Sequence, residues 1–319
     1  MTKREISLRQ AGQHVLKNVV AFMIALFVVF MVFKKPVFVS WGNIVNIINE
    51  CAIYGITACA MTAAIVCGEF DLSASSVFAW STVLCSILCN VMGFVPAMLL
   101  TILCGVIFGL FNGFLVAVVR IPAFVATLGT MTAIKGLAYV VTNAQPVSTT
   151  NAALKAFGQF QLLGITSAPM VFLAVILLFI WFLKKTHAGR ALYATGGNYE
   201  VARLSGIQVK KSKALVFVLL GACAALSGVM YTSRIMAGWA PYGADLSLYC
   251  VAATVIGGTS LSGGSGGVHR TIIGVLLMAI MFNALTMLGV SGSFQKFAQG
   301  LVLITVIMVD AFVSKRLKT

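Results

Sequence analysis

Residues 95–119, VPAMLLTILCGVIFGLFNGFLVAVV, form a stretch of 25 positions without a charged side chain. An α-helix rises 1.5 Å per residue, so this stretch is long enough to cross the roughly 30 Å hydrocarbon core of a bilayer. Similar apolar runs recur along the 319 residues, of which 60% are hydrophobic and 9% charged. The mean hydropathy is +1.03. A water-soluble domain of this size needs more polar surface, so the sequence predicts an all-α, polytopic helical membrane protein.

The apolar runs predict ten transmembrane helices in a single transmembrane domain over residues 1–319. No small-residue cleavage site follows the first run, so we interpret it as a retained span rather than a signal peptide. The predicted spans cover residues 18–33, 44–66, 72–91, 95–119, 122–142, 168–183, 214–232, 245–262, 271–290 and 295–313.

The basic residues predict the orientation. With the N-terminus inside, sixteen of the 22 Lys and Arg fall in cytoplasmic segments, five fall outside and Lys135 lies within a span. Cytoplasmic segments of membrane proteins are enriched in Lys and Arg. Both termini and the basic loop 184–213 are therefore expected in the cytoplasm, and segment 143–167 outside.

The cytoplasmic loop contains a predicted short helix between Asn198 and Gly206. Asn198 is a good N-cap, Glu200 suits the first turn, and Gly206 can adopt the left-handed conformation that ends a helix. Val201 and Leu204 share one face of this helix. A helix of about two turns is unstable alone in water. The residues themselves allow it either to pack on its own protein or to insert into a groove of another one.

Four separated stretches resemble one family. The string GRALYATGGNYEVARLSGI (189–207) keeps the E-x-A-x-x-x-G spacing by which permease subunits of bacterial ATP-binding-cassette (ABC) importers dock on their ATPases. It looks like that region in the ribose/xylose/galactose-type sugar permeases. CGEFDLSASSVFA (67–79), VATLGTMTAIKGLAYVVT (125–142) and VIGGTSLSGGSGG (255–267) are similar to further motifs of those permeases.

The resemblance implies a ten-span fold, two permease subunits per complex (identical or different), a pair of cytoplasmic ABC ATPases that use ATP and Mg²⁺, and an external sugar-binding protein. It implies that loop 184–213 docks on the ATPase. The residues expected to dock are Asn198, Glu200, Val201, Ala202, Arg203, Leu204 and Gly206.

The chain departs from the family at several positions. Cys67 stands where a second glycine is usual. The family often carries an acidic E-L-D-like pair where this chain has Ser247, Leu248 and Tyr249, with Asp245 displaced by two positions. Any role of those acids cannot be carried over, and the sugar or polyol stays open.

Glu69 and Asp71 stand at the predicted junction of the second and third spans. Acids at membrane depth usually face a cavity or a partner, because a charge there is costly. Asp71 also suits the N-cap of the third span. The junction is thus either part of a substrate path at a broken helix or an interfacial turn. Candidate path residues are Glu69, Asp71, Ser73, Asn49, Tyr54, Asn112, Thr127 and Asn283.

Two further features concern the spans. Gly105, Gly109 and Gly113 repeat every four residues, which favours close packing of helices. Lys135 either extends its side chain toward the interface or pairs with an acid such as Glu50 or Glu69.

The sequence also excludes function classes. It has no GxxxxGK[ST] phosphate loop, and its three histidines lack spaced catalytic partners, so we expect no catalytic residue and no enzyme. The sequence contains no CxxC pair, so we expect neither a metal site nor a cofactor in this chain. The net charge of +15 follows membrane topology, so lipid rather than nucleic acid is the expected partner.

We therefore expect a permease subunit of an ABC importer in the bacterial cytoplasmic (inner) membrane, moving a sugar or sugar-like polyol inward by alternating access. Two alternatives stay open: an ion- or proton-coupled secondary transporter, and a scaffold or channel subunit that transports nothing by itself.

Overall fold

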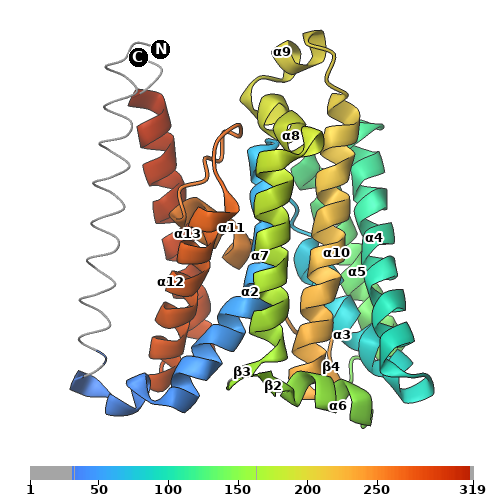
Figure 1. Cartoon of the computed structure of the whole chain (residues 1–319), viewed down its shortest axis with the longest axis vertical. Coiled ribbons are helices and arrows are strands. Elements are labelled where there is room, and N and C mark those ends of the chain that lie inside the picture. The colour runs from blue at the N-terminus through green and yellow to red at the C-terminus, as the bar shows by residue number, and fades with distance from the viewer. Residues whose placement is uncertain (1–30, 32, 163, 317–319) are drawn as a thin grey trace.

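The computed structural model describes residues 31, 33–162 and 164–316, and its ordered elements are almost all helices (Figure 1). A 3₁₀ helix, η1, covers Pro36–Val39. The helices are α2 (Trp41–Val66), α3 (Ala74–Val91), α4 (Phe94–Ala117), α5 (Ala123–Thr142), α6 (Ala152–Gln159), α7 (Ser167–Lys185), α8 (His187–Gly197), α9 (Tyr199–Leu204), α10 (Val209–Ile235), α11 (Leu246–Ile256), α12 (Val268–Met287) and α13 (Gly292–Arg316). The strands are β1 (Val147–Ser148), β2 (Gln161–Leu162), β3 (Ile165–Thr166) and β4 (Ala237–Gly238).

Within the described residues, seven helices are long and apolar enough to cross a membrane: α2, α3, α4, α5, α7, α10 and α12. The predicted all-α membrane fold is confirmed. The first predicted span, 18–33, lies outside the described residues except for residues 31 and 33.

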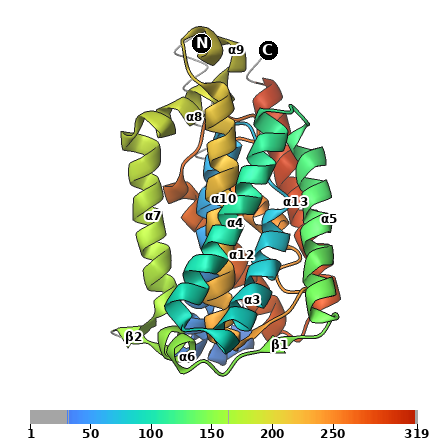
Figure 2. The same cartoon turned by 90° about the vertical axis from the view of Figure 1, so that its right-hand side faces the viewer.

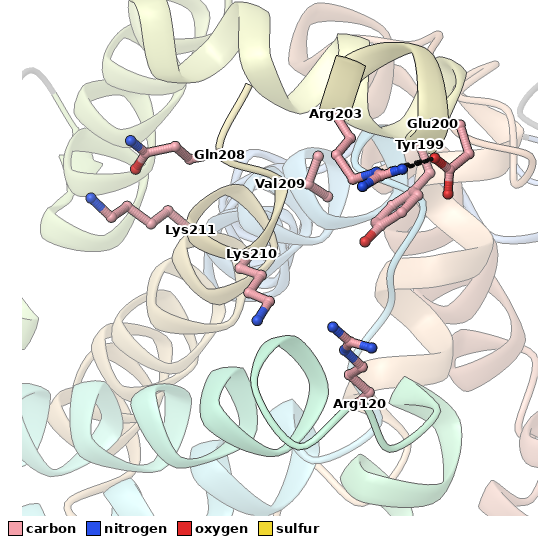
Figure 3. Close-up of a pocket in the computed structure, with 8 residues that line it drawn as sticks. All are labelled: Arg120, Tyr199, Glu200, Arg203, Gln208, Val209, Lys210 and Lys211. Atoms are coloured by element: carbon pink, nitrogen blue, oxygen red, sulfur yellow. Dashed lines mark hydrogen bonds and ion pairs between the residues drawn. The ribbon is translucent and has the colours of Figure 1, made fainter. Parts of the chain in front are cut away.

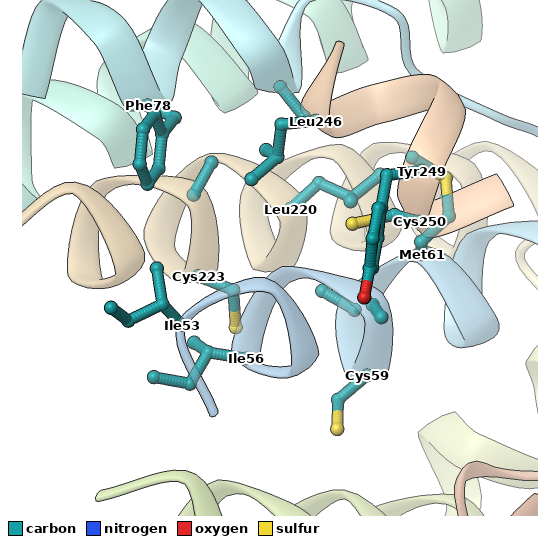
Figure 4. Close-up of a cluster of buried hydrophobic side chains, with 14 of the residues drawn as sticks. Ile53, Ile56, Cys59, Met61, Phe78, Leu220, Cys223, Leu246, Tyr249 and Cys250 are labelled. Atoms are coloured by element: carbon teal, nitrogen blue, oxygen red, sulfur yellow. The ribbon is translucent and has the colours of Figure 1, made fainter. Parts of the chain in front are cut away.

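The core is built around α2, α3 and α10. Of the most apolar windows of these three helices, 67%, 72% and 61% of the residues are buried, against 28–33% for α4, α5, α7 and α12. The latter four therefore form the outer layer, with apolar faces left for lipid. Figure 4 shows side chains from α2, α10 and α11 in one buried apolar cluster, among them Met61, Leu220 and Tyr249.

The glycine repeat of α4 packs against α10, as expected (Figure 2). A methyl group added at Gly109 would lie 2.4 Å from the carbonyl oxygen of Phe217, and one at Gly105 would lie 2.5 Å from the carbonyl oxygen of Gly221. Only glycine permits such close backbones.

The predicted span 245–262 is wrong as a continuous helix. α11 has 11 residues and is about 16 Å long, too short to cross a bilayer. It ends where Gly257 and Gly258 turn the chain, with Gly258 at φ 88°. Before α11 the chain is irregular, and Gly243 lies against the ring of Phe78 on α3. The apolar composition of this region had suggested a full span, but its glycines interrupt the helix.

The two ends of the bundle differ. At one end β1 pairs with β4, Val147 opposite Gly238, and α6 packs on α10 and α7. The second hairpin, β2–β3, lies at this end as well (Figure 1). α8 and α9 cover the other end, toward which α13 also runs. Segments 143–167 and 184–213 thus lie on opposite sides, as the charge pattern predicted.

Candidate functional site

α9 is a six-residue helix that projects from the basic end of the bundle (Figure 1). The Asn198 side chain accepts a hydrogen bond from the Val201 amide at 3.1 Å. Gly206 follows the helix at φ 81°, so the predicted start and end are confirmed. Arg203 pairs with Glu200 at 2.9 Å. Ala202 is buried, whereas Val201 and Leu204 are 58% and 79% exposed. The apolar face of α9 is therefore uncovered in this chain.

The loop 184–213 is more ordered than expected. α7 continues to Lys185, α10 begins at Val209 rather than at residue 214, and α8 occupies eleven residues between them. Thr186 caps α8 by accepting from the Gly189 amide at 2.9 Å. α8 was missed because its small and polar residues show no helical apolar period.

The end of α8 is wedged between two loops of the bundle. Gly196 lies so close to Val66 at the end of α2 that an added methyl group would be 1.9 Å from its carbonyl oxygen. The amide of Gly264 donates to the same oxygen at 2.8 Å. Tyr193 of α8 donates to the carbonyl of Gly266 at 2.9 Å, and burial raises the pKa of this phenol, so it stays protonated. We call this contact of segments 66–68, 193–197 and 263–266 the glycine junction.

Glu69 lies beside the glycine junction and forms an ion pair with Lys213 of α10. Its side chain is 9% exposed and that of Lys213 is 26% exposed. The Lys213 ammonium also lies 5.6 Å from the ring centroid of Tyr199, the first residue of α9. Glu69 therefore has its partner on α10 rather than at Lys135, for which the described residues offer no ion pair.

Asp71, Ser73 and Asn112 form a second, buried group. Asp71 accepts from the Ser73 amide at 2.6 Å, and the Asn112 amide nitrogen donates to the Ser73 hydroxyl at 2.7 Å. Ser73, rather than Asp71, occupies the N-cap position of α3, so that detail of the prediction was wrong. The reason is that Asp71 closes a turn onto Ser73, which shifts the helix start by two residues.

The start of α3 meets the start of α11 at the same level. Ser247 accepts from the Ser75 amide and donates to the Leu72 carbonyl, both at 2.9 Å. Ser247 stands at one of the positions where the family often has acids, and here it joins two interrupted segments through neutral hydrogen bonds.

The remaining candidate path residues do not join this group. Asn283 exchanges hydrogen bonds with Asn43 at 2.9 Å, and Asn49 accepts from the Thr166 hydroxyl. Tyr54 stacks on Tyr249 with ring centroids 4.7 Å apart. Thr127 is buried, and its hydroxyl donates to the Ala123 carbonyl of its own helix. The eight candidates thus divide among separate places along the bundle.

Sequence reasoning missed an aromatic group at the end of the bundle opposite α9. Tyr242 makes edge contacts with Tyr231 and Trp239, with ring centroids at 5.1 and 5.7 Å, and all three residues are half-buried. The available signal was the run GWAPYG (238–243), in which aromatic residues alternate with glycine and proline between two apolar segments.

Long apolar helices around two interrupted segments, with a short amphipathic helix exposed at the basic end, are typical of a multi-pass membrane transporter. Residues 43–307 match the family described as branched-chain amino acid transport system / permease component. This chain belongs to that family. It is a permease component of an ABC importer and not itself an ATPase, and the family implies an ATPase and a binding protein as partners.

Curated relatives match over almost the whole chain. The Ribose import permease protein RbsC of Haemophilus influenzae is 35% identical over 99% of this chain and 99% of its own. The L-arabinose transport system permease protein AraH of Escherichia coli is 31% identical over 89% of this chain and 87% of its own. The Probable ABC transporter permease protein YphD of Escherichia coli is 32% identical over 98% and 95%. No solved structure matches the chain.

Proposed function

We propose that this permease imports a monosaccharide or sugar-like polyol and that α9 is its docking helix on the ATPase. The substrate class rests on relatives whose names state ribose import and L-arabinose transport. The observation that carries the docking role is the uncovered apolar face of a helix too short to persist alone, fixed by caps at both ends.

The glycine junction provides a route for the movement. α9 continues from α8, whose last residues contact the end of α2 and the loop that links α11 to α12. A displacement of α9 by the ATPase as it binds ATP with Mg²⁺ would therefore shift the inner ends of helices that belong to the core. In this proposal the group Asp71, Ser73 and Asn112 lies on the inner part of the sugar path, with Tyr54, Asn49 and Asn283 farther out. Glu69 lies at the inner end of the bundle, where the movement of α9 would reach the core helices.

Copurification tests the docking role. Leu204→Asn places a polar group on the apolar face of α9, and Val91→Asn makes the same kind of change at the end of α3, where Val91 is 74% exposed. We expect the Leu204 variant to lose its cytoplasmic ATPase in mild detergent and the Val91 variant to keep it. Equal retention by both folded variants would contradict docking through α9.

Uptake by the complex in proteoliposomes separates the transporter classes. We expect uptake of labelled ribose or arabinose that requires the binding protein and ATP and is insensitive to collapse of ion gradients. Uptake that follows an ion gradient without ATP would support a secondary transporter instead, and no uptake of any sugar would support a non-transporting subunit.

The outer aromatic group gives a second prediction for the same assay. Aromatic faces bind the apolar faces of sugar rings, and Trp239 and Tyr242 are half-buried near the outer end. Trp239→Ala should reduce sugar uptake at least about tenfold, a loss of roughly 1.4 kcal/mol. The ATPase should still copurify. Trp41→Ala, which removes a 64% exposed Trp at the start of α2, is the matched control and should leave uptake unchanged.

A further inference from the structure

Two adjoining cavities lie at the inner ends of α4, α9 and α10. The larger has a volume of about 700 Å³ and the smaller about 300 Å³, and both are lined by Arg120, Tyr199, Val209 and Lys210. Glu200 and Arg203 of α9 line the larger cavity and Glu69 lines the smaller one, whereas the exposed apolar residues Val201 and Leu204 line neither. The buried group Asp71, Ser73 and Asn112 lies outside both cavities. We call the two together the basic cavity.

The basic cavity has more positive charge than its own acids neutralise. Arg203 is paired with Glu200, and Lys213 is paired with Glu69. The lining residues Arg120, Lys210 and Lys211 have no ion pair in the part of the chain that the structure describes. Figure 3 shows the side chains of Arg120 and Lys210 pointing into the same space from opposite walls. Two cations directed at one space repel unless an anion lies between them.

The backbone conformation of Arg120 also indicates a role for its side chain. Arg120 has φ 69°, in the left-handed region that glycine adopts freely and other residues rarely do. It occupies the tight turn between α4 and α5, where the Ile121 amide donates to the Leu115 carbonyl at 3.1 Å. Glycine would suit this turn better, so a guanidinium here indicates a role for the side chain beyond the turn itself.

The surroundings of Arg120 place the basic cavity at the surface of the membrane. The candidate span α4 ends at Ala117, three positions before Arg120. Before Arg120 in the chain, Val118 and Val119 are 53% and 50% exposed, and after it Phe124 and Val125 are 52% and 57% exposed. An anion held at Arg120 therefore has apolar protein surface on both sides, as a phosphate attached to acyl chains would require.

We propose that the basic cavity binds the phosphate headgroup of an anionic phospholipid of the inner leaflet. Basic pockets between transmembrane helices on the cytoplasmic side recognise such headgroups. Arg120 and Lys210 hold the phosphate, and the apolar surface on either side of Arg120 accommodates the acyl chains. The bound lipid lies against Tyr199 at the base of α9.

The test is lipid retention by the purified full-length chain, measured by native mass spectrometry during titration with phosphatidylglycerol or with phosphatidylcholine of the same acyl chains. The test variant is Arg120→Gln/Lys210→Gln. The matched control is Lys184→Gln/Lys185→Gln, which removes two exposed charges from the end of α7, outside the cavity. Arg120→Gly/Lys210→Gln is a second test variant, because glycine keeps the turn if glutamine disturbs it.

We expect saturable binding of phosphatidylglycerol in preference to phosphatidylcholine. Loss of two cations should weaken it about 30-fold, and the control should bind as the wild type does. Equal binding by all variants would overturn the proposal. Displacement of the lipid by millimolar inorganic phosphate would assign the site to a free anion instead. Loss of the partner ATPase from the test variants without any change in lipid binding would assign the cavity to an acidic protein segment.

Discussion

The ion pair between Glu69 and Lys213 links three parts of the chain that are distant in sequence. Glu69 follows α2, Lys213 belongs to α10, and Tyr199, whose ring faces the ammonium, begins α9. A nearly buried carboxylate needs a partner, because an uncompensated charge in a protein interior is costly. This pair therefore fixes the position of the loop between α2 and α3 relative to α9.

Removing one partner should be worse than removing both. We expect Lys213→Gln to lower the stability of the folded chain by about 1–3 kcal/mol, since it leaves the Glu69 carboxylate without a cation. Thermal unfolding in detergent should show the loss for Lys213→Gln and partial recovery for Glu69→Gln/Lys213→Gln. A double variant less stable than the single one would contradict this account.

At the scale of elements, the contact of α4 with α10 depends on missing side chains. Gly105 and Gly109 let backbone lie on backbone, whereas Gly136 on α5 has no atom within 4 Å of the place where a methyl group would stand. Glycine thus permits close backbone packing on α4, whereas on the neighbouring α5 it borders open space.

This difference gives a matched pair of substitutions. Gly109→Ala should destabilise the protein by about 1–3 kcal/mol, because the added methyl group overlaps the Phe217 carbonyl. Gly136→Ala should be neutral or stabilising by about 0.5–1 kcal/mol, because alanine favours a helix where space is free. The midpoints of thermal unfolding in detergent compare the two. An unchanged midpoint for Gly109→Ala would show that α4 moves away at little cost.

Elements also differ in how far the sequence predicts them. The bounds of α2 and α5 agree with the predicted apolar runs to within three residues, and α9 follows from Asn198 and Gly206. α12 begins and ends three residues earlier than the predicted span 271–290. The sequence pattern predicts neither α8 nor the interruption before α11. α8 is held by contacts of Gly196 with Val66, and the segment before α11 by contact of Gly243 with Phe78. Such contacts between residues far apart in sequence leave no local periodicity to detect. For the same reason, residue type alone could not predict which of the candidate path residues lie together, and the structure places them at separate points along the bundle.

At the scale of the whole molecule, all eight cysteines are free thiols, and all but the half-buried Cys104 are buried. A membrane-impermeant maleimide should therefore label the unaltered chain poorly. This makes the orientation measurable without removing native cysteines.

Two introduced cysteines test the orientation. Lys155→Cys lies on α6 at the predicted outer end, and Lys185→Cys lies at the predicted cytoplasmic end of α7. In intact cells the maleimide should label the Lys155 variant, and the Lys185 variant only after the membrane is permeabilised. The reverse pattern would invert the orientation and place α9 outside, away from any cytoplasmic ATPase.

The shortness of α11 has a consequence for synthesis. A helix of about 16 Å cannot settle across the bilayer by its own hydrophobicity when it leaves the ribosome. Its neighbours in the finished fold include α2, made long before, and α12, made just after. Insertion of this part of the chain must therefore wait for α12 and use the earlier helices as its template. A chain stopped before Val268 should leave α11 exposed to quality-control proteases.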